Sequence, residues 1–369
     1  MQWKVLCYLL TVLLAPAAFT ASAANPLAIR VESPIPLADN LGDTWVAAWA
    51  AGGTVYTPSD DTKGFHAVAN SNIAFNKVIG DDVRTLHGIT VNAMKDYGKG
   101  GQKGADGCTW KSSGCYCLDG TIYWVVARHK YGEDSADPQR RQPASNASII
   151  KSTDFGKTWT RSAKDNYERP MFPGSRFATP YFVEYGQDGR ASVDNADRHV
   201  YALSNDGFWD NGNSLILGRV ARSKLGNLMG TDWQYYSGGD GMDDSAWTSR
   251  MAQAKLVLNA PGRLGMNGAV YVPGLGRYIL IGWYYPAGGG KLKDARHTTN
   301  WDFYQAPKPW GPWTKISTHV SNPQGYYSPQ LCPKFTSADG RRLFVMTAGD
   351  WKEGDYYRLT IVPLRVEGE

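Results

Sequence analysis

Hydrophobic residues occur along this chain in short runs and almost never at helical spacing. Runs rich in β-branched and aromatic residues alternate with clusters of Gly, Asp and Asn over most of its length. This alternation is typical of short strands joined by tight turns. The pattern therefore predicts an all-β protein.

One pattern occurs five times: a turn containing Gly or Asp, then an apolar strand that ends in polar residues. It is spelled AGGTVYTPSDD, LDGTIYWVVAR, ADRHVYALSND, GLGRYILIGWY and ADGRRLFVMTAGD. The first strand residues are Val55, Ile122, Val200, Tyr278 and Leu343, at intervals of 67, 78, 78 and 65 residues. A repeat of this length has room for about four strands. We therefore expect each repeat to form one blade of a five-bladed β-propeller.

The repeat continues through the middle of the chain without a Pro- or Ser-rich linker. This continuity favours one domain over residues 25–369 rather than two domains. The last repeat has too little chain left for a full blade, whereas the N-terminal stretch PLAIRVE (26–32) has strand character. We expect this stretch to supply the outer strand of the last blade and so close the ring.

A turn motif, STDFGKTW at residues 152–159, follows a strand of the second repeat. Its S-x-D-x-G-x-T-W spacing resembles the Asp-box of sialidases and other β-propellers. Asp154 can accept backbone N–H groups within the turn, and Gly156 can adopt a positive φ. The motif lies 37 residues after Ile122, which places it at the outer hairpin of a blade. We therefore interpret Asp154 as a structural staple and not as a catalytic group.

The first 24 residues have the features of a secretory signal peptide: Lys4, an apolar run, and small residues up to Ala24. A membrane anchor is the alternative, but Pro16 and the small-residue end favour cleavage. We therefore expect an extracellular, secreted protein without a membrane anchor in its mature form. Four cysteines then remain, Cys108, Cys115, Cys117 and Cys332, and in an oxidising compartment they predict two disulfide bonds. A zinc site is less favoured because C-x-x-C pairs are missing.

The formal net charge of +5 is spread along the chain and forms no basic block. Nucleic acid is therefore not an expected partner. No P-loop, dinucleotide fingerprint or metal-ligand spacing is present, so we expect no cofactor. The 14 Trp and 21 Tyr residues suit either a β-rich core or the stacking of sugar rings. We expect a monomer whose partner is a polysaccharide or oligosaccharide substrate.

The inner strand of each propeller blade lines the central axis, so residues at the start of these strands are candidates for a binding pocket. They are Asp43, Trp110, Lys111, Arg176, Asn267 and Gln330. The loop after the second strand of the first repeat adds Asp60 and Asp61, and a hairpin can bring these to the same end of the axis as Asp43.

Enzymes that cleave glycosidic bonds commonly use two carboxyl groups, one as an acid and the other as a base or nucleophile. Asp43 with Asp61, or with Asp60, is the pair that the repeat favours. Asp82, Asp119 and Asp206 are less well placed alternatives. Aspartates in turns also cap backbone N–H groups, so a structural role for each is the competing interpretation.

Among the histidines, His87 has the best functional case because it follows Asp81 and Asp82, and His129 follows a strand next to Arg128. A structural role is the alternative for both. Lys111 and Arg176 also suit a pocket for an anionic sugar. A polysaccharide lyase acting on uronates would use them with His87, and a non-catalytic glycan-binding propeller would use the aromatic residues alone.

Several stretches together resemble a family of secreted five-bladed propellers, formerly of unknown function, whose characterised members are endo-D-arabinanases. They are GDTWVAAWAAGGTVYTPSDD, NIAFNKVIGDD, CTWKSSGCYCLDGTIYWVVAR, IIKSTDFGKTWT, VPGLGRYILIGWY, APKPWGPWT and YYSPQLCPKFTSADGRRLFVMTAGDW. The resemblance spans about residues 41–365 and implies a glycoside hydrolase with acids at Asp43 and at Asp60 or Asp61. The family often has an acidic residue in the first hairpin, where this chain has WAAGG (49–53). The first hairpin of this chain therefore lacks the acidic residue that is common in the family.

Overall fold

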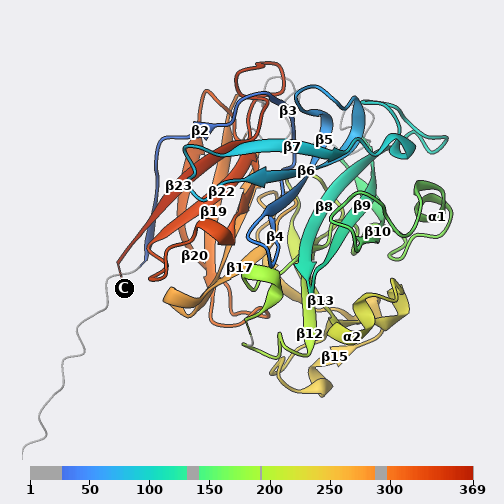
Figure 1. Ribbon diagram of the computed structural model, residues 1–369. Coiled ribbons are helices and arrows are strands. Elements are labelled where there is room, and N and C mark those ends of the chain that lie inside the picture. The colour runs from blue at the N-terminus through green and yellow to red at the C-terminus, as the bar shows by residue number, and fades with distance from the viewer. Residues whose placement is uncertain (1–26, 131–140, 192, 287–296, 369) are drawn as a thin grey trace, which may run out of the picture.

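The computed structural model describes residues 27–130, 141–191, 193–286 and 297–368. Its strands form five antiparallel sheets arranged around a central axis (Figure 1). The prediction of an all-β, five-bladed propeller is therefore confirmed. The N-terminal residues 1–26, which include the predicted signal peptide, lie outside the described residues.

The blades follow one another along the chain. Blade one contains β3 (Asn40–Asp43), β4 (Ala48–Trp49), β5 (Val55–Phe65), β6 (Ser71–Ile79) and β7 (His87–Asn92). Blade two contains β8 (Thr109–Leu118), β9 (Thr121–His129) and β10 (Ala144–Ser152). Blade three contains β11 (Tyr181–Phe182), β12 (His199–Asn205), β13 (Ser214–Ala221), β14 (Trp233–Tyr236), β15 (Trp247–Thr248) and β16 (Leu256–Asn259). The five repeated sequence anchors all lie in the second strand of a blade, in β5, β9, β12, β18 and β22.

The last two blades complete the ring. Blade four contains β17 (Ala269–Val272), β18 (Arg277–Tyr284), β19 (Thr299–Ala306) and β20 (Thr314–Ser321). Blade five contains β21 (Tyr327–Leu331), β22 (Arg342–Ala348) and β23 (Thr360–Glu367), together with β1 (Ala28–Val31) and β2 (Ile35–Pro36). Strand β1 pairs with β23 from Ala28 opposite Glu367 to Val31 opposite Leu364. The predicted closure of the ring by the N-terminal strand is therefore confirmed.

Helical segments are short. The described residues contain α1 (Ala163–Glu168), α2 (Arg222–Leu225) and several single 3₁₀ turns. None of the helices in this part of the chain is long and apolar enough to cross a membrane.

Burial changes from the axis outward. Every residue of β8, an inner strand, is buried, whereas β20 at the outer edge of blade four alternates between exposed and partly buried positions. Inner strands are covered on both faces because neighbouring blades pack on each side of them. This packing accounts for the long apolar runs of the central strands and for the polar character of the outer ones.

Blades two and three meet very closely at the axis. The N–H of Gly114 in β8 donates to the carbonyl of Pro180 at 2.9 Å, just before β11. A Cβ atom at position 114 would lie 2.7 Å from that carbonyl oxygen and 2.7 Å from the Cα of Tyr181. Glycine is therefore required where these two inner strands touch.

The turn after β10 is held by its own side chains, as the sequence predicts. Asp154 accepts hydrogen bonds from the backbone and hydroxyl of Thr158, at 2.9 and 2.7 Å, and from the Ser152 hydroxyl at 2.8 Å. These bonds lower the pKa of Asp154 to about 2. The φ of Gly156 is +88°, and the Trp159 ring packs edge-on against Phe75 of blade one. Asp154 therefore tightens the turn.

The prediction of two disulfide bonds is wrong for this structure, in which all four cysteines are free thiols. Cys115 and Cys117 point into the central hydrophobic cluster from one strand, whereas Cys332 packs in the cluster between blades five and one. Cys108 lies before β8, near the backbone of Asp106. An even count of cysteines predicts pairing only if the fold brings the thiols together, and here Cys108, the neighbouring Cys115 and Cys117, and Cys332 lie in three separate regions.

Candidate active site

The acidic residues predicted in blade one meet at one end of the axis. Strand β3 ends at Asp43, and β3 pairs with β5 so that Asp43 lies opposite Asp60. Asp61 follows directly, with a φ of +40°. Asp60 and Asp61 lie within β5 and not, as expected, in a loop after it; the pairing of β3 with β5 brings them together with Asp43.

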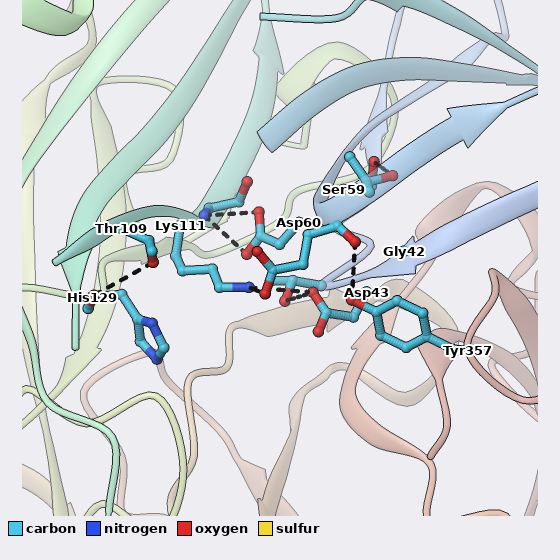
Figure 2. Close-up of polar contacts among 12 residues, drawn as sticks. Gly42, Asp43, Ser59, Asp60, Thr109, Lys111, His129 and Tyr357 are labelled. Carbon is cyan, nitrogen blue, oxygen red and sulfur yellow. Dashed lines mark hydrogen bonds and ion pairs between the residues drawn. The ribbon is translucent and has the colours of Figure 1, made fainter. Parts of the chain in front are cut away.

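Lys111 joins this group from the inner strand of blade two. Its Nζ lies 2.6 Å from Oδ2 of Asp61 and 3.9 Å from Oδ1 of Asp43. Figure 2 shows the Lys111 side chain reaching toward Asp43, with His129 and Tyr357 on opposite sides of the group. The side chains of Lys111 and Asp43 are 4% and 7% exposed, whereas that of Asp61 is 25% exposed. Asp61 is thus the carboxylate of the pair that faces solvent.

Asp43 is a buried carboxyl group with several polar partners. The Tyr327 hydroxyl donates to its Oδ2 at 2.7 Å, and the Thr44 hydroxyl donates to its Oδ1 at 3.2 Å. Burial raises the pKa of Asp43; the Lys111 ammonium group opposes this shift and the Asp61 carboxylate adds to it. Asp43 is therefore poised to hold a proton at a higher pH than a solvent-exposed aspartate.

Asp60 differs from Asp61, although the two are adjacent. It is completely buried, and both of its oxygens accept the backbone N–H of Ser112, at 3.0 and 3.1 Å. Burial raises the pKa of Asp60 well above its ordinary value, against the opposing charge of Lys111. Asp60 thus ties blade one to blade two.

Three of the positive-φ residues of the described chain lie in the same region. Thr44, Asp61 and Ser328 have φ values of +55°, +40° and +47°. A positive φ is costly for residues other than glycine, by about 1–3 kcal/mol each, and such residues cluster at functional sites. Thr44 follows Asp43 directly, and Ser328 follows Tyr327. The strain therefore lies next to the residues that hold the Asp43 carboxyl group.

His129 completes one side of the group. It is fully buried, and its pKa lies well below the ordinary value because of burial and the nearby Lys111 ammonium group, with a hydrogen bond to Gln142 acting in the opposite direction. The imidazole is therefore neutral near pH 7. It packs against Trp209, which in turn contacts Tyr327 at 5.2 Å between ring centroids.

Two further predicted residues lie deeper on the axis. The inner strands of all five blades surround a small cavity that Gln330 and the buried Glu184 line. Within the described part of the chain, Nε2 of Gln330 and Oε1 of Glu184 have no hydrogen-bond partner, and neither does Nδ2 of Asn267. Burial alone raises the pKa of Glu184 well above its ordinary value. Gln330 and Glu184 thus place polar atoms without hydrogen-bond partners at this cavity.

The remaining predicted binding residues do not join the acid group. Trp110 lines a separate hollow, where its ring lies under the Arg128 guanidinium group at 4.3 Å. Arg176 is exposed and donates to the carbonyls of Met251 and Ala254, so the expectation that it lies at the axis is wrong. His87 is exposed at the start of β7, the outer strand of blade one. The Lys111, Arg176 and His87 set required of a lyase is therefore not assembled.

The alternative aspartates have structural contacts. Asp82 accepts the N–H of Arg84, Asp119 pairs with Arg222, and Asp206 accepts two hydrogen bonds from Asn213. Across the described ranges, no group of three or more His, Cys, Asp and Glu side chains is placed to hold a metal ion.

Other residues of the site were missed by the sequence analysis. Tyr327, Tyr357, Asp210 and Asp350 come from blades three and five, and Tyr357 donates to the Asp61 carbonyl at 3.2 Å. Asp210 and Asp350 both follow the second strands of their blades, β12 and β22. That shared place in the repeat was the signal that could have identified them.

The sequence matches no known family model, and no curated protein matches it. Solved structures are similar in fold. A candidate hydrolase from Bacteroides ovatus ATCC 8483 aligns with a TM-score of 0.54 and 11% identity, over 94% of this chain and 93% of that one. The β-xylosidase RS223 aligns with a TM-score of 0.49 and 12% identity, over 91% and 94%. At 11% identity, the likeness to the Bacteroides ovatus protein shows a shared fold alone.

Proposed function

We propose that this protein is a glycoside hydrolase that cleaves a polysaccharide at the axial acid group, with Asp43 as acid and Asp61 as base or nucleophile. One observation carries the proposal: Asp43 and Asp61 share the Lys111 ammonium group but differ in environment. Asp43 is buried with a raised pKa, whereas Asp61 is ion-paired and partly exposed. One buried carboxyl group with a raised pKa beside one partly exposed carboxyl group suits acid-assisted cleavage of a glycosidic bond, in which one group donates a proton and the other acts as base or nucleophile.

In this mechanism, Asp43 donates its proton to the glycosidic oxygen as the bond breaks. The resulting Asp43 carboxylate is stabilised by the Tyr327 hydroxyl and by Lys111, which both lower its pKa. Asp61 either removes a proton from the attacking water or attacks the anomeric carbon itself. Asp60 takes no part in the chemistry and fixes the position of Lys111 through its bonds to Ser112.

The resemblance of the chain to endo-D-arabinanases makes D-arabinan the first substrate to test. The signal-like residues 1–24 lead us to propose that the protein acts outside the cell. The acid group itself is compatible with several neutral glycans.

The test is a product assay with the wild type and the Asp43→Asn and Asp61→Asn variants on plant, fungal and mycobacterial polysaccharides. Removal of one catalytic carboxyl group should lower kcat by at least about 100-fold, since general acid–base catalysis contributes about 10²–10⁴. Asp339→Asn is the matched control because Asp339 is an exposed turn residue of blade five, bonded to Ser337 and Arg341.

Full activity in both site variants would refute the assignment of these residues. A wild type that binds a polysaccharide but releases no product from it would instead indicate a non-catalytic glycan-binding propeller.

A further inference from the structure

A histidine–carboxylate pair lies between blades four and five. His297 precedes β19, Asp350 follows β22, and His297 Nδ1 lies 2.6 Å from Asp350 Oδ2. The Asp350 side chain is completely buried, and its other oxygen accepts the N–H of Lys352 at 2.9 Å. The His297 side chain is 42% exposed. A fixed carboxylate thus orients an imidazole ring that remains open to solvent.

Tyr285, which follows β18, links this pair to the acid group. Burial raises the pKa of Tyr285 well above its ordinary value, and the carboxylates of Asp210, Asp43 and Asp350 add to the shift. The hydroxyl is buried and has no hydrogen-bond partner within the described residues. Buried hydroxyl groups are normally bonded, so an unpaired one indicates a missing ligand or water.

Trp351 supplies an aromatic surface beside these donors. Its ring is partly exposed and stands edge-on to Tyr285 and to Tyr327, with centroids 6.4 and 6.2 Å apart. Tyr327 is the residue whose hydroxyl binds Asp43. Trp351 is therefore connected to the proposed acid, Asp43, through one residue, Tyr327.

We propose that Trp351, Tyr285 and the His297–Asp350 pair form a sugar subsite next to the acid group. The inference rests on the proposed function and extends it. The Trp351 ring packs against the apolar face of one sugar unit and His297 Nε2 forms a hydrogen bond with one of its hydroxyl groups, while the buried Tyr285 supports the Trp351 ring by its edge-on contact. An aromatic surface with a few convergent polar groups is the usual composition of such a pocket.

The charges around the subsite define its ligand. Besides the proposed acid Asp43, the acidic side chains of Asp210 and Asp350 act on the Tyr285 hydroxyl. The nearby ammonium group, that of Lys111, already pairs with Asp61. A uronate or another anionic sugar would be repelled here, so the subsite takes an uncharged sugar unit.

The test compares Trp351→Ala, Trp351→Phe and His297→Gln with the wild type, first by thermal unfolding and then by kinetics on the polysaccharide that the wild type cleaves. If it cleaves none, binding is measured by affinity electrophoresis in gels that contain D-arabinan, arabinoxylan or polygalacturonate. Matched controls are Phe155→Ala, an exposed aromatic residue at the outer turn of blade two, and His319→Gln on the outer strand β20.

We expect Trp351→Ala and His297→Gln to raise KM, or to weaken retardation, by about 10-fold each, which corresponds to about 1.4 kcal/mol. Trp351→Phe should recover part of the loss, kcat should change little, and the controls should match the wild type. Unchanged KM in folded variants, while Asp43→Asn is inactive, would overturn the subsite and leave the proposed function intact. Preferential binding of polygalacturonate would overturn the inference of an uncharged ligand, and a wild type that neither cleaves nor binds any of these glycans would overturn both proposals.

Discussion

The buried Glu184 makes the stability of this protein depend on pH in a specific way. Its carboxyl group lies in the axial cavity, with Oε1 unpaired within the described residues. Its pKa is raised well above the ordinary value of 4.5, and burial is the cause. The unfolded chain therefore releases this proton near pH 4.5, whereas the folded protein retains it to a higher pH.

Because the unfolded state binds fewer protons, the contribution of Glu184 to stability falls as pH rises above 4.5. The slope is at most about 1.4 kcal/mol per pH unit, for one proton, until the pH reaches the folded-state pKa. Glu184→Gln keeps the size of the side chain and cannot ionise. Between about pH 5 and about pH 7, the unfolding free energy of the variant relative to the wild type should therefore increase by up to about 1.4 kcal/mol per pH unit.

Urea unfolding of both proteins across this range measures the difference directly. The raised pKa values of Asp43 and Asp60 affect both proteins equally and so cancel. The control is Glu353→Gln, at an exposed position near the C-terminal end. The difference in unfolding free energy between this variant and the wild type should be the same at every pH. If the difference between Glu184→Gln and the wild type were independent of pH, the conclusion that this carboxyl group stays protonated in the fold would be refuted.

Three more predictions follow from the same structure. Lys111→Met should raise the pKa of Asp43 further, because Lys111 now lowers it; the alkaline limb of the pH–kcat profile should then move to higher pH, and a downward shift would contradict the proposed acid. Gly114→Ala should destabilise the fold by about 1–3 kcal/mol because its Cβ would clash with the Pro180 carbonyl; an unchanged melting temperature would rule out that close contact. Asp154→Ala should cost about 1 kcal/mol in urea unfolding without affecting product release, and inactivity of the folded variant would disprove its staple role.

The repeat made much of this structure predictable. The spacing of the anchors located the second strand of every blade, and the positions of Asp43 and Asp61 followed because inner strands and hairpins return to one end of the axis. The choice between Asp60 and Asp61 was not predictable. It depends on the positive φ of Asp61 and on the hydrogen bond that the Ser112 N–H donates to Asp60. Both come from the packing of blade two.

Residues whose contacts lie far away in the sequence were predicted less well, for physical reasons. The position of Arg176 depends on the backbone carbonyls of Met251 and Ala254, about 75 residues later in the chain. Tyr327 reaches Asp43 across 284 positions, and no local pattern encodes such a distance. The cysteines show the same limit, since their number carries no information on which thiols the packing brings together.

The pairing of β1 with β23 also affects how the chain can be made and rearranged. Blade five is incomplete until residues near both ends of the described fold have met, so this ring closes only when β1 pairs with β23. Until then the edge of β23 stays open to other strands, including those of a second molecule. The same pairing places Ala28 beside Glu367. A short linker could therefore join these two positions, and new ends could be opened in a turn between blades without changing the order of strands around the ring.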